Sequence, residues 1–252
     1  MILAAGQGPA VLLLHGIGGR ASLWQPSLDA LSPQYRAVAL DMPGYDGDPV
    51  PDPLTFPLLA AQVVAVMGGL GLAAAHVIGH SMGGMVALEL AATHPGRVRS
   101  LVLAATSAAF GGRDAGFRDA FLAARQKPLE EGRGMAGVAA DLVPGMAGPA
   151  ADPAAIPAAT AAMATVPEAA YRAALRCLTG FDRSAALPGI AVPTLVLAGE
   201  ADATAPPRGM ARLAAAIPGA RFATLPGVGH LLPLEAPVAF HAEVLDFLGG
   251  LS

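Results

Sequence analysis

The sequence predicts an α/β protein built on a mostly parallel, doubly wound central sheet. Short apolar runs alternate along the chain with longer segments whose apolar residues have helical spacing. Each run is bounded by Gly, Pro or Asp, as expected for strands that are buried on both faces of a parallel sheet. The chain has 252 residues, of which 54% are hydrophobic and 13% charged. It therefore has enough apolar material for a large buried sheet.

The predicted elements follow one another in strand–helix order. Six apolar runs are predicted strands: 11–14, 37–40, 76–78, 101–104, 194–198 and 222–225. Five segments between or after them are predicted helices: 22–31, 58–70, 82–93, 207–217 and 236–248. Such alternation is typical of a twisted parallel sheet with helices on both of its faces.

One long stretch, residues 107–186, breaks this order because it contains no evident strand. It includes helix-like pieces at 117–125 and 169–178 and a section rich in Pro and Ala. A stretch of this length is too long for a single loop in a compact domain. We therefore predict a core domain made of residues 1–106 and 187–252, with a small helical insertion at 107–186.

Composition narrows the function classes. The net charge of −4 argues against a nucleic-acid partner, and no apolar run has the length of a membrane span. The N-terminal residues lack the positive region of a secretion signal, so we expect a cytoplasmic protein. We also expect a monomer or homodimer that acts on a small molecule. The single cysteine, Cys177, cannot form an internal disulfide and is expected to be a buried apolar residue.

The segment GHSMGG, residues 79–84, places Ser81 between a predicted strand and a predicted helix. Gly79 and Gly83 complete the pattern Gly-x-Ser-x-Gly, in which glycines allow a sharp turn that exposes the serine hydroxyl. A serine at this position could also serve only as a helix N-cap. The rest of the chain has to distinguish a nucleophile from a cap.

Further reactive groups follow other predicted strands. The segment HGIGG at 15–19 follows the first strand, Glu200 and Asp202 follow the fifth, and His230 follows the sixth. Ligands bind at the carboxyl edge of such a sheet, so these groups should meet there. A weakly nucleophilic serine needs an imidazole to take its proton, and the imidazole needs a carboxylate to orient it. The sequence therefore predicts a Ser–Asp–His triad.

These segments together resemble the α/β-hydrolase superfamily of serine hydrolases. The matching pieces are LLLHGIGG, ALDMPGY, VIGHSMGGMVALELAATHP, LVLAA, VPTLVLAGEAD and PGVGHLLPLE. The resemblance implies that Ser81 is the nucleophile, Asp202 the acid and His230 the base. It also implies that the N–H groups of Ile17 and Met82 form an oxyanion hole and that the insertion is a cap. No cofactor and no metal are implied, since zinc-ligand spacing and a dinucleotide fingerprint are both missing from the sequence.

Two departures from the family accompany this resemblance. Relatives usually have two strands before the first strand predicted here, whereas only residues 1–5 precede Gly6. We therefore expect a truncated sheet edge or a true start further upstream. The loop DMPGYDGDP carries Asp46 where relatives often have glycine, which leaves the shape of the pocket wall open at that point.

Several other polar residues were weighed against these roles. Glu200 competes with Asp202, but the Gly-x-x-Asp spacing favours Asp202. The remaining histidines are expected to be structural or solvated, with the His80 side chain on the opposite side of the turn from Ser81, and Asp41 is expected to organise a loop. The substrate-pocket candidates are Gly16, Trp24 and, for a carboxylated substrate, an inward-turned Arg172, Arg176 or Arg183.

A serine nucleophile excludes the relatives that use aspartate, namely haloalkane dehalogenases and most epoxide hydrolases. The residues after the base, Leu231 and Leu232, differ from the tryptophan often found there in C–C bond hydrolases. The sequence is most similar to 3-oxoadipate enol-lactonases and small carboxylesterases, which implies hydrolysis of a small ester or lactone. C–C bond hydrolysis, thioester hydrolysis and cofactor-free perhydrolase or haloperoxidase activity stay open. A binding protein is disfavoured because all three triad residues are present.

Overall fold

The computed structural model describes residues 1–111 and 115–251, and its centre is a seven-stranded sheet. The strand order is β1-β3-β2-β4-β5-β6-β7, and every neighbouring pair is parallel except β1 and β3. The strands are β1 (Ile2–Ala5), β2 (Ala10–Leu14), β3 (Arg36–Leu40), β4 (Ala75–His80), β5 (Val98–Ala104), β6 (Thr194–Gly199) and β7 (Arg221–Leu225). The predicted fold class is confirmed.

The six predicted strands all lie within observed strands, but β1 was not predicted. Residues 2–5 pair antiparallel with β3, from Ile2 opposite Leu40 to Ala5 opposite Ala37. β1 has only four residues and alternates between exposed and half-buried positions. It therefore lacks the continuous apolar run that marks the buried strands, and the sheet has one more strand at this edge than the sequence predicts.

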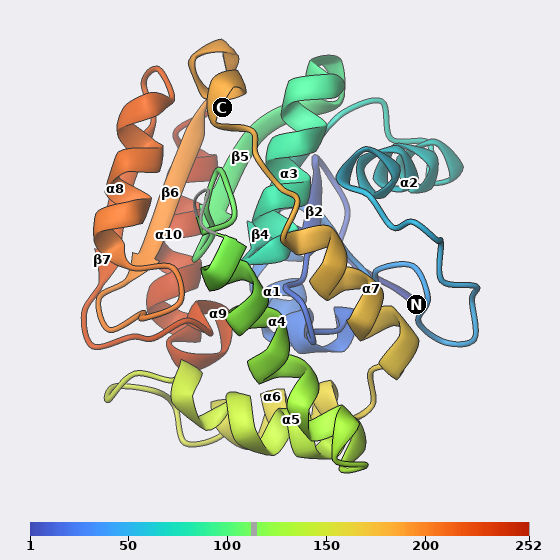
Figure 1. Cartoon of the computed structure of the whole chain (residues 1–252). Helices are drawn as coiled ribbons and strands as arrows, with labels where there is room; N and C mark the ends of the chain where they lie inside the picture. The colour runs from blue at the N-terminus through green and yellow to red at the C-terminus, as the bar shows by residue number, and fades with distance from the viewer. Residues whose placement is uncertain (112–114, 252) are drawn as a thin grey trace.

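Helices cover both faces of the sheet (Figure 1). Helix α1 (Gln25–Leu31) packs against α10 (Pro237–Gly249), and α2 (Phe56–Gly69) packs against α3 (Met82–Thr93). Helix α8 (Pro207–Ala216) packs against β6 and β7. Because the strands between these helices are buried on both sides, their carboxyl ends are fixed relative to one another. This edge of the sheet can therefore hold side chains from several strands in a defined arrangement.

Four helices lie between β5 and β6 in the chain and gather across the lower front of Figure 1, coloured green to gold. They are α4 (Ala115–Glu130), α5 (Gly134–Leu142), α6 (Ala155–Ala164) and α7 (Glu168–Leu178). The helix-like pieces predicted at 117–125 and 169–178 lie within α4 and α7. Val138, Met163, Tyr171 and Leu175 are among the buried residues of an apolar cluster separate from the core around the sheet.

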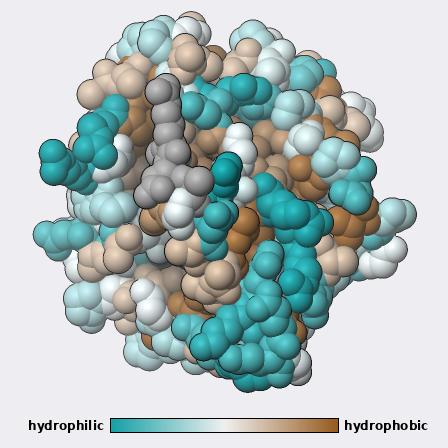
Figure 2. All heavy atoms as spheres, viewed as in Figure 1, coloured by the Kyte–Doolittle hydropathy of each residue, from teal (hydrophilic) through white to brown (hydrophobic). Residues whose placement is uncertain are grey.

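The surface of the molecule is mixed in character. On the face seen in Figure 2, hydrophilic and hydrophobic residues are interspersed. Val238 is the most exposed of the large apolar side chains described, at 84%, and Met1 and Phe117 follow at 50% each. Across residues 1–111 and 115–251, no helix combines the length and the apolar character needed to cross a bilayer.

Candidate active site

Ser81 lies in a sharp turn between β4 and α3. Its backbone has φ 53° and ψ −119°, a conformation that non-glycine residues rarely adopt and that must be held by its surroundings. The Ser81 N–H donates to the carbonyl of Ala104 at 2.9 Å, and the Thr106 hydroxyl donates to the Ser81 carbonyl at 2.7 Å. The end of β5 therefore supports this strained turn and aims the serine hydroxyl outward.

The two glycines of the motif permit close contact between the chain segments around Ser81. A Cβ on Gly79 would lie 2.4 Å from the carbonyl oxygen of Gly83, and a Cβ on Gly83 would lie 2.1 Å from that of Leu14. Either atom would push α3 away from the strands. The Gly-x-Ser-x-Gly spacing is thus required by backbone packing beside the serine.

The structure brings Ser81, His230 and Asp202 into one hydrogen-bonded chain. The Ser81 Oγ lies 3.0 Å from Nε2 of His230, whose Nδ1 lies 2.8 Å from Oδ2 of Asp202. A carboxylate only accepts hydrogen bonds, so Nδ1 carries the proton and Nε2 is free to accept one from the serine. This is the arrangement that general-base activation of a serine requires.

Asp202 is buried, and its ionised form is held by hydrogen bonds. Its Oδ1 accepts from the backbone N–H groups of Thr204 at 2.7 Å and Ala205 at 2.9 Å. Burial alone would raise the pKa of Asp202, but these bonds and the His230 contact outweigh it and lower the pKa. The carboxylate is therefore charged where it contacts the imidazole.

Glu200, the competing carboxylate, lies elsewhere. Its Oε2 accepts from the N–H of Gly227 at 2.8 Å, and its side chain stabilises the loop that leads towards His230. A second serine–histidine contact, His76 Nδ1 to Ser100 Oγ at 2.8 Å, occurs near the starts of β4 and β5. The His76–Ser100 contact lies at the opposite end of β4 from Ser81. Neither this contact nor the one between Glu200 and Gly227 belongs to the candidate site.

The loop after β2 approaches the serine directly. A Cβ on Gly16 would lie 2.9 Å from the Cβ of Ser81, so only glycine fits at this position. Gly16, Ile17 and Ser81 line the same cavity. Among the hydrogen bonds of residues 1–111 and 115–251, none uses the Ile17 N–H, and the N–H of Met82, as the first residue of α3, has no acceptor within its helix.

His80 differs from its expected orientation. Its ring lies 5.2 Å from the His230 ring, and its Nε2 lies 2.7 Å from the His230 carbonyl oxygen. The prediction that it points to the other side of the turn is therefore wrong. Burial, then the nearby His230, lowers its pKa to about 3, so His80 is neutral and its Nε2–H donates to that carbonyl. His80 thus fixes the backbone of His230.

Glu235 is a site residue that the sequence analysis missed. It is 2% exposed, and its carboxylate accepts from the N–H groups of Gly148, Gly229 and Leu231, each at 2.7 Å. It therefore organises the loop on both sides of His230. The signal in the sequence was a charged residue at the end of the otherwise apolar segment HLLPLE. A carboxylate buried with such a segment requires hydrogen-bond donors around it, which indicates a structural role near His230.

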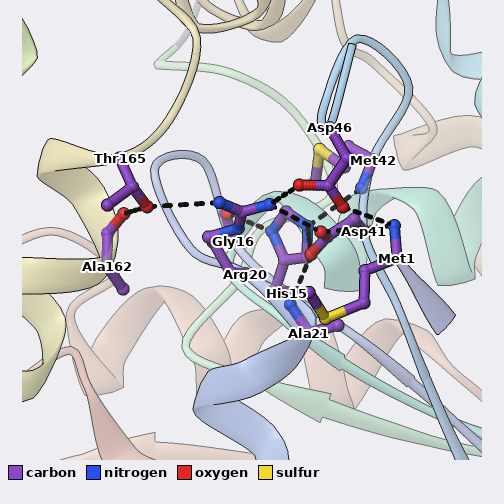
Figure 3. A network of polar contacts seen from close by, with 10 residues as sticks. All are labelled: Met1, His15, Gly16, Arg20, Ala21, Asp41, Met42, Asp46, Ala162 and Thr165. Atoms are coloured by element: carbon purple, nitrogen blue, oxygen red, sulfur yellow. Dashed lines mark hydrogen bonds and ion pairs between the residues drawn. The ribbon is translucent and has the colours of Figure 1, made fainter. Parts of the chain in front are cut away.

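A polar network lies behind the loop of Gly16 (Figure 3). Arg20 contacts Asp46, Asp41 at 3.1 Å and the Thr165 hydroxyl at 3.3 Å, so it joins the core to the end of α6. Asp41 also accepts from the Ala21 N–H at 2.6 Å, in keeping with its expected role in the loop. Asp46 has φ 54°, which explains why glycine also suits this position.

The N-terminal amine and His15 complete the network in Figure 3. The amine lies 3.0 Å from Asp46 and 3.4 Å from Asp41. His15 accepts from the Met42 N–H through Nε2 at 3.0 Å, and burial lowers its pKa. The neutral His15 therefore shapes the loop, as the sequence predicts.

Two cavities lie beside Gly16 and Ile17, and Ser81 lines one of them. The larger, about 180 Å³, contains Ser81 and His230 in its wall together with Phe121 and Arg125. The smaller, about 60 Å³, is lined by Trp24, whose buried Nε1 has no hydrogen-bond partner in the described part of the chain. Gly16, Ile17 and His80 line both. Gly16 therefore lines the cavity of Ser81, whereas Trp24 lines the neighbouring one, and Arg125 was not among the sequence candidates.

The three arginines proposed from the sequence do not line the cavity of Ser81. Arg172 pairs with Glu168 at 2.8 Å on the same helix. Arg183 makes a two-point contact with the buried Glu89, and Arg176 lies in a separate cleft with these two residues. The structure contradicts their expected place because carboxylates of the protein already hold two of them. Within the described part of the chain, no three His, Cys, Asp or Glu side chains are grouped as metal ligands.

Comparison with known proteins finds relatives that are hydrolases by name. RutD of Variovorax paradoxus strain S110, a candidate carbamate hydrolase by name, is 35% identical and covers 97% of this chain and 93% of its own length. A pimeloyl-[acyl-carrier protein] methyl ester esterase of Xanthomonas campestris is 33% identical, over 94% and 92%. The enol-lactonase of Burkholderia xenovorans superimposes with a TM-score of 0.89 at 28% identity, over 99% and 96%.

The family assignment rests on most of the chain. A model described as the alpha/beta hydrolase family matches residues 11–243, which include Ser81, Asp202 and His230. The match begins in β2, ends in α10 and spans the four helices between β5 and β6. The chain is an enzyme of the α/β-hydrolase family.

Proposed function

We propose that this enzyme hydrolyses small esters or lactones through an acyl-enzyme formed on Ser81. The continuous hydrogen-bonded chain from Ser81 through His230 to Asp202 carries the proposal. His230 is the general base and acid, and Asp202 holds its tautomer and stabilises the imidazolium that forms. The lactone part of the proposal is supported by the likeness to the enol-lactonase of B. xenovorans.

Acylation begins when the Ser81 oxygen attacks the substrate carbonyl carbon while its proton passes to Nε2 of His230. The carbonyl π electrons move to oxygen and form a tetrahedral oxyanion, which the N–H groups of Ile17 and Met82 stabilise. When the oxyanion collapses, the C–O bond to the leaving group breaks. The imidazolium gives its proton to the leaving alkoxide or enolate, and the acyl group remains on Ser81.

Deacylation repeats the sequence with water. His230 takes a proton from water, the hydroxide attacks the acyl carbon, and the second oxyanion expels the Ser81 oxygen, which regains its proton from His230. The products are a carboxylic acid and the alcohol, or one hydroxy or keto acid from a lactone. We further propose that residues 107–186 act as a cap, because their helices form a separate apolar cluster and Phe121 and Arg125 of α4 line the cavity.

Ser81→Ala tests the proposal. A p-nitrophenyl ester panel should show turnover by the wild type and a loss on the order of 10⁶-fold in the variant, because no other group accepts the acyl chain. A fluorophosphonate should add one label to the wild type, which peptide mass mapping should locate on Ser81. Full activity in Ser81→Ala, or labelling of another residue, would refute the acyl-enzyme.

The other reactions open to this triad are tested in the same assay series. Small lactones, acyl thioesters, carbamates and a C–C cleavage substrate should be compared at equal concentration, with peracid formation measured separately. The proposal expects the highest kcat/KM among esters or lactones. A thioester, carbamate or C–C substrate that exceeds them would reassign the substrate while leaving Ser81 as nucleophile.

A further inference from the structure

Arg125 is unusual among the arginines near the site. It lies on α4 and lines the same cavity as Ser81 and His230, whereas Arg20, Arg172 and Arg183 contact carboxylates of the protein. Of the ion pairs formed by residues 1–111 and 115–251, none includes Arg125. Among the residues that the structure describes, it is therefore a cation in the cavity wall with no fixed counter-ion.

The surroundings of Arg125 do not neutralise its charge. Burial lowers its pKa, which shows that desolvation of the guanidinium is not offset by a nearby anion. Tyr171 is a titratable group that interacts with Arg125, and burial raises the pKa of the Tyr171 hydroxyl to about 12. Tyr171 is thus neutral at ordinary pH. A half-buried cation of this kind gains free energy from any anion that enters the cavity.

The position of the guanidinium is fixed by stacking. Its Cζ lies 3.5 Å from the centre of the Phe121 ring, one helical turn earlier on α4. Phe121 in turn packs edge-to-face on Phe110, with ring centres 4.7 Å apart. Stacking occupies the flat face of a guanidinium and leaves its in-plane N–H donors available for two parallel bonds to a carboxylate.

We propose that Arg125 binds a carboxylate carried by the substrate, so that the enzyme prefers small dicarboxylic half-esters or carboxylated lactones to neutral ones. This inference rests on the proposed hydrolysis at Ser81. Apolar side chains such as Met85, Phe121 and Leu178 line the same cavity. They suit the methylene groups between a carboxylate at Arg125 and a carbonyl carbon at Ser81. Arg125 is a specificity-determining residue in this scheme and takes no part in bond breaking.

Two substrates of matched length test the preference. The p-nitrophenyl half-ester of glutaric acid and p-nitrophenyl valerate have the same leaving group and five acyl carbons, and only the first carries a carboxylate. That carboxylate is ionised at pH 7.5, because this pH is well above the ordinary pKa of such a carboxyl group, about 4.3. The wild type should have the higher kcat/KM for the half-ester. A wild type that prefers valerate would overturn the proposal without any variant.

The ratio of the two kcat/KM values is then compared across variants. Arg125→Met should lower the ratio by about 10- to 100-fold, mainly through KM for the half-ester, as expected for loss of a charge-assisted bidentate pair. Arg125→Lys should lie in between because it keeps the charge and loses the planar pair of donors. Arg118→Met, an exposed arginine on the same helix, is the matched control and should leave the ratio unchanged.

The outcomes separate this inference from the proposed function. If both esters are hydrolysed through Ser81 and Arg125→Met leaves the ratio unchanged, the inference fails and the esterase proposal stands. If neither the esters nor carboxylated lactones are hydrolysed, the proposed function itself fails. If Arg125→Met does not fold, the inference is tested by comparing the ratio of the two kcat/KM values in the wild type with that in Arg125→Lys. Equal ratios in the wild type and Arg125→Lys would overturn a bidentate contact.

Discussion

The carboxylate that orients His230 can be identified by comparing two acidic residues that are only two positions apart. Asp202 contacts Nδ1 of His230 at 2.8 Å, whereas Glu200 holds the Gly227 N–H. Asp202→Asn should reduce kcat on the order of 10⁴-fold, because the amide favours the wrong imidazole tautomer. Glu200→Gln should cost only a few-fold, since it affects a supporting loop. Steady-state kinetics on one ester checks both, and a reversed order would mean that Glu200 is the acid.

The structure places Ser81, His230 and Asp202 within hydrogen-bonding distance because each follows a strand end that the fold brings to the same edge of the sheet. The sequence did not predict Arg125, because a residue inside a helix of an insertion carries no strand-end signal. The direction in which such a helix faces depends on packing between distant segments. For the same reason, the sequence could not exclude Arg172 and Arg183 as ligands of a substrate carboxylate. Only the structure identified their partners, Glu168 and Glu89.

At the level of the elements, the loop before α9 (Leu232–Glu235) carries His230 and depends on one buried carboxylate. Glu235 accepts three backbone hydrogen bonds, two of them through Oε2. Glu235→Gln replaces one oxygen by an NH₂ group, which cannot accept. The free energy of unfolding should fall by about 1–3 kcal/mol, with lower kcat because the base is less well held.

Urea unfolding of the Glu235→Gln variant measures this cost, and Glu243→Gln is the control. Glu243 pairs with Arg221 at the surface, where its side chain is 32% exposed. An exposed pair contributes about 0–1 kcal/mol, so this change should be small. Equal losses in the two variants would show that the buried carboxylate has no special role in supporting His230.

The elements themselves were predictable to different degrees. Strands β2 to β6 are buried along nearly their whole lengths, so each appears in the sequence as an apolar run with clear ends. The edge strand β1 has no such run, since only one of its faces is partly covered. In the insertion, the Pro- and Ala-rich section obscured α6, because alanine is compatible with buried and exposed helix positions alike.

For the whole molecule, several buried histidines make stability depend on pH. Burial lowers the pKa values of His15, His76, His80 and His241, and that of His80 falls to about 3. In the unfolded chain these histidines bind protons with the ordinary histidine pKa of about 6.5. Below that pH the unfolded chain therefore holds more protons than the folded protein. The stability is therefore complete above about pH 6.5 and should fall as the pH decreases towards 3.

Chemical unfolding at pH 7, 6, 5 and 4 checks this dependence. His80→Asn keeps a donor towards the His230 carbonyl but cannot be protonated, so its stability should fall less steeply with acid than that of the wild type. His94→Asn, at the end of α3, serves as the comparison. If the two variants and the wild type share one slope, His80 does not contribute to the acid sensitivity.

The backbone contacts between the base loop and residues 146–148 limit how the insertion can be exchanged between relatives. The His230 N–H donates to the carbonyl of Met146 at 2.7 Å, and Gly148 lies so close to the loop that a Cβ would be 2.3 Å from the Gly227 oxygen. A chimera that grafts a foreign segment over 107–186 would thus replace part of the backbone support of His230. Exchange at α4 and α7, with Met146 to Gly148 retained, alters the cavity wall and preserves that support.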